Sequence, residues 1–187
     1  MHIFEERYKE MVGEAIRART EFGIVLAKND GIVNTGCTVS VEQVVTEYPD
    51  GRLDVLTKGR RRFEIIYLDQ EKAYLRGHVE FFDDDHAESI PPELQDQAVR
   101  GFRRLSESGS VRANAEPSMN DPQLSFQLAQ AIEDLDFQST LLRSRSEAER
   151  LRRLNEFLEE YIPRMKHATR MKHLAPMNGF GQKQAGV

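Results

Sequence analysis

Histidine and cysteine are the residue types that most often build metal sites, and both are sparse in this sequence. The chain of 187 residues has one cysteine, Cys37, and five histidines. A zinc site needs three or four converging ligands, but His167 and His173 are too far apart in sequence to share one helix face as an i, i+4 pair would. The pattern therefore predicts no metal site, and a single cysteine excludes an internal disulfide.

Motifs for catalysis are also missing from the sequence. It has no phosphate-binding loop of the form G-x-x-x-x-G-K-[ST], no nucleophile elbow of the form G-x-S-x-G, and no serine and lysine in the context of a hydrolytic dyad. We therefore expect a protein that is not an enzyme and that binds no cofactor.

The densest basic cluster is Arg60, Arg61 and Arg62, which Phe63 follows. Arginines beside an aromatic ring could grip a nucleic-acid backbone, so RNA binding is one hypothesis. On a strand, however, consecutive side chains alternate between the two faces, which splits the cluster. The formal net charge of -5 also disfavours binding to phosphates. The competing interpretation is that these arginines protect a strand edge by their charge.

The composition is typical of a soluble globular protein. Hydrophobic residues make up 39% of the chain and charged residues 30%, and no apolar run approaches the roughly 20 residues that cross a bilayer. Glu5, Glu6 and Glu10 occupy the place where a signal peptide would carry basic and then apolar residues. We therefore predict a cytoplasmic protein without a membrane partner.

Residues 1–115 are predicted to form a β-rich subdomain, a meander of antiparallel strands around one early helix. Apolar residues near the start recur at the spacing of one helix face and are expected to lie in the core. They are Phe4, Tyr8, Met11, Val12 and Ala15. A bend or bulge is expected near Gln43, and Asp50-Gly51 is a hairpin signal. The predicted strands span residues 22–27, 36–49, 52–59, 60–69 and 73–82.

Residues 116–175 are predicted to form a helical subdomain. Its last helix has the best-marked start, because Ser146 and Glu149 have the spacing of a capping box. Residues 176–187 lack any apolar pattern and are predicted to be disordered. The helices are expected at residues 124–132, 137–142 and 146–162, after an earlier helix from the Pro91-Pro92 pair to about Gly109.

Several separated blocks of the sequence follow a familiar order. They are HIFEERYKEMV, FGIVLA, GIVNTGCTVSVEQV, YPDGRLDVLTKGRRRFEI, LSFQLAQAI and SEAERLRRLNEFLEE. In this order and spacing they resemble the N-terminal substrate-binding domain of Lon protease over nearly residues 1–165. The resemblance is to the stand-alone Lon-domain proteins of bacteria more than to full-length Lon, because the sequence contains neither the ATPase domain nor the Ser-Lys peptidase domain.

The resemblance implies an α+β fold: a PUA-like antiparallel β pseudo-barrel with an early helix, followed by a C-terminal helical bundle. It also implies a noncatalytic module of protein quality control that recognises unfolded or tagged polypeptide, with a separate ATP-dependent protease as a partner. Which residues form the peptide-binding surface is not indicated by the sequence.

The best-matched motif contains Phe4, Glu5, Arg7 and Tyr8, which we interpret as structural residues near the start of a helix packed on the barrel. In the family an apolar strand and a Pro-Gly turn precede this motif, and here they are missing: either the start codon is misassigned or the barrel lacks its first strand. A barrel without this strand has unpaired backbone donors and acceptors along the neighbouring strand. In that case we expect an open sheet edge, through which the chain binds peptide by strand addition or associates with itself.

Overall fold

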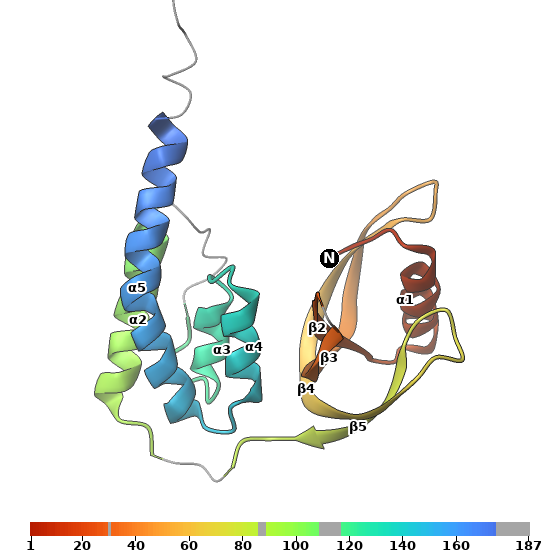
Figure 1. Ribbon diagram of the computed structural model, residues 1–187, viewed down its shortest axis with the longest axis horizontal. Helices are drawn as coiled ribbons and strands as arrows, with labels where there is room; N and C mark the ends of the chain where they lie inside the picture. The colour runs from red at the N-terminus through yellow and green to blue at the C-terminus, as the bar shows by residue number, and fades with distance from the viewer. Residues whose placement is uncertain (30, 86–88, 109–116, 175–187) are drawn as a thin grey trace, which may run out of the picture. The chain divides into compact units, whose positions relative to one another are not determined.

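The computed structural model describes residues 1–29, 31–85, 89–108 and 117–174, with side chains as far as residue 171 (Figure 1). The chain forms two compact units. The N-terminal unit combines Met1–Asp84 with Leu135–Arg143, and the helical unit combines Asp85–Asp134 with Ser144–Val187. The boundary predicted at residues 115 and 116 and the tail predicted to be disordered, residues 176–187, lie outside the described residues.

The N-terminal unit is built on one antiparallel sheet. Its described strands follow the order β1-β4-β3-β2, and β5 pairs with β4 as well. They are β1 (His2–Ile3), β2 (Phe22–Lys28), β3 (Gly31–Glu47), β4 (Leu53–Asp69) and β5 (Arg76–Phe82). The sheet and the accompanying helices confirm the predicted α+β class.

Two local predictions about the strands are confirmed. The register between β3 and β4 shifts between Val41 and Gln43, which is the expected bulge. The hairpin turn lies at Asp50-Gly51, where Gly51 has φ of 80° and its N–H donates to the carbonyl of Tyr48 at 2.9 Å.

The two strands predicted at residues 52–59 and 60–69 are one strand, β4. Gly59 suggested an end, but it pairs with Val39 at a point where the register of β3 and β4 shifts. The glycine therefore marks an irregularity within a continuous strand rather than a turn.

Helix α1 (Glu6–Ala18) covers part of the sheet and is the predicted early helix. It ends at Arg19, which has φ of 53° and lies in the left-handed region. Buried Val12 and Ala15 of α1 pack into the core of this unit with residues of four strands. These strand residues are Ile3, Phe22, Val39 and Val55.

The prediction that Phe4 and Tyr8 belong to this core is wrong. Phe4 is 60% exposed and Tyr8 is 37% exposed. Phe4 precedes the first helical residue, Glu6, so the helical spacing does not apply to it.

The predicted pseudo-barrel is not closed. In the described part of the chain β2 pairs only with β3, and β5 pairs only with β4. Each of these two strands therefore keeps an outer edge with no strand beside it.

Helix α4 (Leu135–Arg143) belongs to the N-terminal unit, although it follows the first helices of the helical unit in sequence. It packs against β3 and buries Leu141. The ammonium of Lys28 on β2 lies 2.5 Å from the carboxylate of Asp136 on α4.

The helical unit consists, among the described residues, of α2 (Pro92–Glu107), α3 (Leu124–Ala129) and α5 (Glu147–Leu174). α2 and α5 approach closely at Gly101, where a Cβ atom would lie 2.9 Å from Cδ1 of Leu158. α5 runs through Pro163, well past the end predicted at Ile162. None of the described helices combines the length and the apolar character that crossing a membrane would require.

A buried polar network joins α3 to α5. The guanidinium of Arg150 donates to Oε2 of Glu147 at 2.7 Å, to Oγ of Ser125 at 3.0 Å and to the carbonyl of Ser144 at 2.9 Å. The other oxygen of Glu147 accepts the backbone N–H of Ser125 at 2.7 Å. Such a network is stable because both buried charges are paired and hydrogen-bonded.

Candidate functional site

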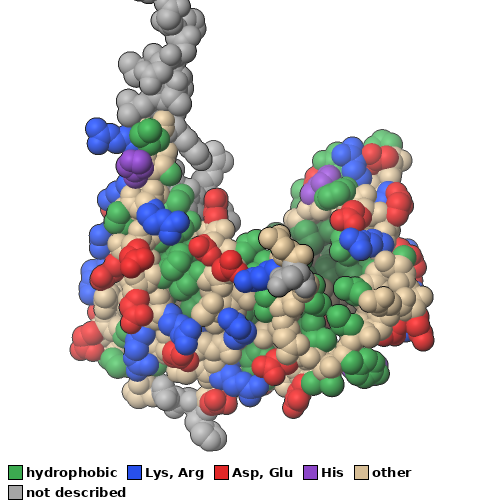
Figure 2. Space-filling view, viewed as in Figure 1, with side chains coloured by type: hydrophobic (Ala, Val, Ile, Leu, Met, Phe, Trp, Pro, Cys, Tyr) green, Lys and Arg blue, Asp and Glu red, His purple; other side chains and the backbone are tan. Residues whose placement is uncertain are grey.

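A cavity of about 800 Å³ opens in the N-terminal unit between the outer edges of β2 and β5. Its volume lies within the usual range of ligand pockets. The walls come from α1, from β2 and from the β4–β5 hairpin, with β1 at one end. The space-filling view shows a hollow in this unit, with apolar side chains on its walls (Figure 2).

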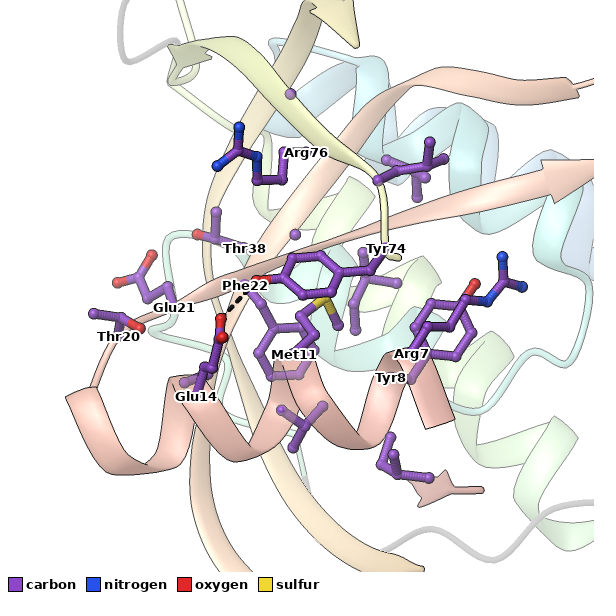
Figure 3. Close-up of a pocket in the computed structure, with 18 of the residues that line it drawn as sticks. Arg7, Tyr8, Met11, Glu14, Thr20, Glu21, Phe22, Thr38, Tyr74 and Arg76 are labelled. Carbon is purple, nitrogen blue, oxygen red and sulfur yellow. Dashed lines mark hydrogen bonds between the residues drawn. The ribbon is translucent and has the colours of Figure 1, made fainter. Parts of the chain in front are cut away.

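The interior of the cavity is mainly apolar. In the close-up, Met11 of α1 points toward Phe22 of β2, and the ring of Tyr74 lies across them (Figure 3). Phe63 and Ile65 of β4 also line the cavity. The start of β2, residues 22–25, and Arg76, Gly77 and Val79 of β5 line it as well.

Large apolar side chains lie exposed around the mouth of the cavity. Exposed apolar side chains that gather at one cavity are typical of a site that binds another molecule. The lining residues that are both large and exposed are Met1, Phe4, Tyr8, Ile24, Leu68 and Leu75.

A polar cluster joins the β4–β5 connection to α1. Glu14 of α1 accepts a hydrogen bond from Nζ of Lys72 at 2.8 Å and another from the hydroxyl of Tyr74 at 2.6 Å (Figure 3). The bonds from Lys72 and then Tyr74 lower the pKa of the Glu14 carboxyl below its usual value. The same carboxylate raises the pKa of the Tyr74 phenol. These bonds position one wall of the cavity.

A second cluster holds β1 against β4 and positions Phe4. Nδ1 of His2 lies 2.7 Å from Oδ1 of Asp54, and the hydroxyl of Tyr48 donates to Oδ2 of Asp54 at 2.7 Å. The bond from His2, followed by the bond from Tyr48, lowers the pKa of the Asp54 carboxyl. The ring of Phe4 stacks on His2 with centroids 5.9 Å apart, so this cluster places an exposed aromatic at the mouth.

In the described part of the chain, no three His, Cys, Asp or Glu side chains come together as metal ligands. Cys37 on β3 is partly buried, and burial raises the pKa of its thiol. A thiol in such surroundings is a poor nucleophile.

The sequence matches a known protein family. Residues 1–160 match the substrate-binding domain of ATP-dependent protease La (Lon). The chain belongs to the Lon substrate-binding domain family. A domain of this family is a substrate-recognition module and is itself noncatalytic.

Two solved structures share the fold of this Lon domain. The Lon N-terminal domain protein from Xanthomonas campestris superposes with a TM-score of 0.64 at 22% identity, over 82% of this chain and 85% of that chain. The N-terminal domain of Lon protease from Mycobacterium avium complex superposes with a TM-score of 0.59 at 18% identity, over 85% of this chain and 90% of that chain.

The three arginines that suggested RNA binding do not form one patch in this Lon domain. Arg60 donates to Glu42 at 2.7 Å, and Arg61 lies over the ring of Phe81, 3.6 Å from its centroid. Arg62 is 6% exposed and makes an ion pair with Asp84 at 2.5 Å. One member of the cluster is therefore inaccessible to a ligand, and the other two already have partners.

The start of the Lon motif lies at the cavity. Nε of Arg7 donates to the carboxylate of Glu5 at 2.9 Å, and the guanidinium of Arg7 lies 4.6 Å from the ring centroid of Tyr8. Phe4, Glu5, Arg7 and Tyr8 all line the cavity. Their structural role stays a prediction. The sequence did not indicate the cavity, because helical spacing does not show whether an apolar helix face packs in a core or lines a cavity.

Proposed function

We propose that this Lon domain recognises unfolded or tagged polypeptide by burying apolar side chains of the ligand in the cavity between α1, β2 and β5. The observation that carries the proposal is the cavity of about 800 Å³, with large apolar residues exposed at its mouth. The family, which is one of substrate-binding domains, supports it.

The lining is suited to ligands of varied sequence. Met11 and the aromatic rings of Phe22 and Tyr74 offer large, adaptable apolar contacts. Each apolar side chain of the ligand that becomes fully buried would contribute about 1.5–3 kcal/mol. A few such contacts are enough for micromolar binding after the costs of association.

The partner and setting of this function are also part of the proposal. A noncatalytic recognition module affects the fate of its ligand only through another protein, so we propose that the domain acts with a separate ATP-dependent protease in cytoplasmic quality control. RNA binding through Arg60, Arg61 and Arg62 is the less favoured hypothesis, because Arg62 is buried. A steep dependence of RNA affinity on salt would support RNA binding.

Substitution at the mouth of the cavity tests the proposed function. Leu75 lines the cavity and is 49% exposed, whereas Leu56 on β4 is 56% exposed and does not line it. Binding of a fluorescent, reduced and alkylated protein is measured by anisotropy for the wild type, Leu75→Ser and Leu56→Ser. We expect Leu75→Ser to weaken binding about tenfold, the loss of one apolar contact, and Leu56→Ser to leave it unchanged.

A second pair of variants repeats the comparison at another wall. Phe4→Ser is matched with Ile66→Ser, since these residues are 60% and 62% exposed and only Phe4 lines the cavity. Equal losses in the lining and control variants would show that the cavity is not the binding site. Thermal unfolding of each variant checks that the fold is intact.

A further inference from the structure

We infer that the ligand of this cavity is an extended, uncharged segment with alternating apolar side chains, bound as an added β-strand beside β2 or β5. The inference rests on the proposed function and names the ligand class and its mode of binding. It begins from the position of the cavity, which two open strand edges border at once.

The open edges supply backbone hydrogen-bonding groups. A strand with one neighbour leaves the N–H and C=O of every second residue directed away from the sheet. β2 and β5 are in this state in the described part of the chain, and both contribute residues to the cavity wall. An extended peptide between them can pair through its main chain, which is the usual mode of strand addition.

A glycine lies in each edge strand at the cavity. Gly23 of β2 and Gly77 of β5 line the cavity, and both are exposed. Glycine weakens a strand but allows another backbone to approach closely. Both glycines also leave room for side chains of the cavity wall, because a Cβ atom would lie 3.0 Å from Cζ of Phe63 at Gly23 and 3.4 Å from Cδ2 of Leu68 at Gly77.

The dimensions set the length of the occupant. β2 and β5 each have seven residues, and a strand rises about 3.3 Å per residue, so each edge is roughly 23 Å long. A bound segment of up to about seven residues would present its alternate side chains to Met11, Phe22 and the other apolar residues of the interior.

The charges at the cavity favour a neutral occupant. The acidic and arginine side chains that line it already have partners of opposite charge in the chain. Glu5 pairs with Arg7, Glu14 with Lys72, Glu21 with Arg61, and Arg76 with Asp69 and Glu71. A charged ligand side chain directed inward would lose water without gaining a free partner.

Backbone methylation tests the strand. The full chain is titrated with a capped heptapeptide in which valine alternates with threonine, and with two copies N-methylated at the odd or at the even positions. N-methylation removes donors along one edge of the peptide and keeps every side chain. We expect at least one methylated peptide to bind about tenfold or more weakly than the parent, and a peptide with lysine in place of valine to lose binding.

Hydrogen exchange locates the contact. Addition of the parent peptide should slow exchange of backbone amides within β2 or β5. The part of β3 from Gly36 to Val39 should change little, because both of its edges are already paired.

The outcomes separate the two proposals. If parent and methylated peptides bind equally, or if unfolded protein binds and the heptapeptide does not, strand addition is wrong while the recognition function survives. If neither unfolded protein nor peptide binds, the recognition function fails and strand addition fails with it. The last outcome is a dimer in sedimentation together with hydrogen exchange in which the amides of β2 or β5 are protected without peptide. That combination would mean that a second copy of the chain occupies these edges, and it would contradict the proposed peptide ligand.

Discussion

Tyr74 and Glu14 join two walls of the cavity: the phenol of Tyr74 donates to Oε2 of Glu14 at 2.6 Å, and Lys72 donates to the other carboxylate oxygen at 2.8 Å. On the same helix, the carboxylate of Glu10 lies 3.8 Å from the ammonium of Lys72, and Arg17 is a further charged neighbour of Glu14. The β4–β5 connection is thereby held to α1.

Glu14→Gln should make the domain less stable at neutral pH but not in acid. The folded-state pKa of Glu14 is below its usual value of 4.5, so the carboxylate stabilises the fold above pH 4.5 and this contribution is lost as the pH falls through the folded pKa. We expect a melting temperature about 1–3 °C below wild type at pH 7 and no difference near pH 3. Glu47→Gln, at an exposed carboxyl that ends β3, is the control. A difference that stays the same at both pH values would contradict this role of Glu14.

Gly36→Ala should destabilise the sheet. A Cβ atom at this position would lie 2.5 Å from the carbonyl oxygen of Ile24 and 2.5 Å from Cζ of Phe63. Because one neighbour is backbone and the other a buried ring, we expect a loss of about 1–3 kcal/mol in urea unfolding. Gly59→Ala is the matched control, since its Cβ would only meet Sγ of Cys37 at 3.5 Å. Equal stability of the two variants would show that β2 can move away from β3.

Substitution of Arg62 should lower the free energy of unfolding much more than substitution of Arg61, although the two residues are adjacent. Arg62→Ala removes a buried guanidinium that pairs with Asp84 and donates to the carbonyl of Leu142 at 3.3 Å, so we expect a loss of about 2–3 kcal/mol. Arg61→Ala removes a stacked but exposed guanidinium, with an expected loss of about 0.5–1 kcal/mol. Chemical denaturation measures both. A loss of RNA binding in Arg61→Ala without a loss of stability would revive the nucleic-acid hypothesis.

Arg150 and Glu147 should behave as one unit in the helical part of the protein. Arg150→Met leaves the carboxylate of Glu147 buried beside Ser125 without its charged partner, which we expect to cost about 3–5 kcal/mol. The double variant with Glu147→Leu should recover part of this loss. A double-mutant cycle in guanidinium chloride measures the coupling, and additive effects of the two substitutions would contradict it.

Local patterns in the sequence predicted local structure well. The Asp50-Gly51 turn and the bulge near Gln43 were both predictable, because each depends on neighbouring residues alone. The continuity of β4 through Gly59 was not, since it depends on the register against β3. Helix α4 was predicted approximately, but an amphipathic pattern does not say which partner its apolar face will contact.

The candidate site was harder to predict than the fold. Phe4 and Tyr8 have the spacing of one helix face, but the helix begins only at Glu6, after Phe4. Both side chains line the cavity and are exposed, and the pattern within residues 4–8 does not show whether the helix face packs in a core or borders a cavity.

In the described part of the chain the outer edges of β2 at Gly23 and of β5 at Gly77 are unpaired, and this affects which ligands the cavity would select. Amide and carbonyl groups are the same in every polypeptide, and in a native protein they are already engaged within its own helices and sheets. A domain that binds these groups by strand pairing would therefore select segments that are unfolded. The amino-acid sequence of the segment would matter less.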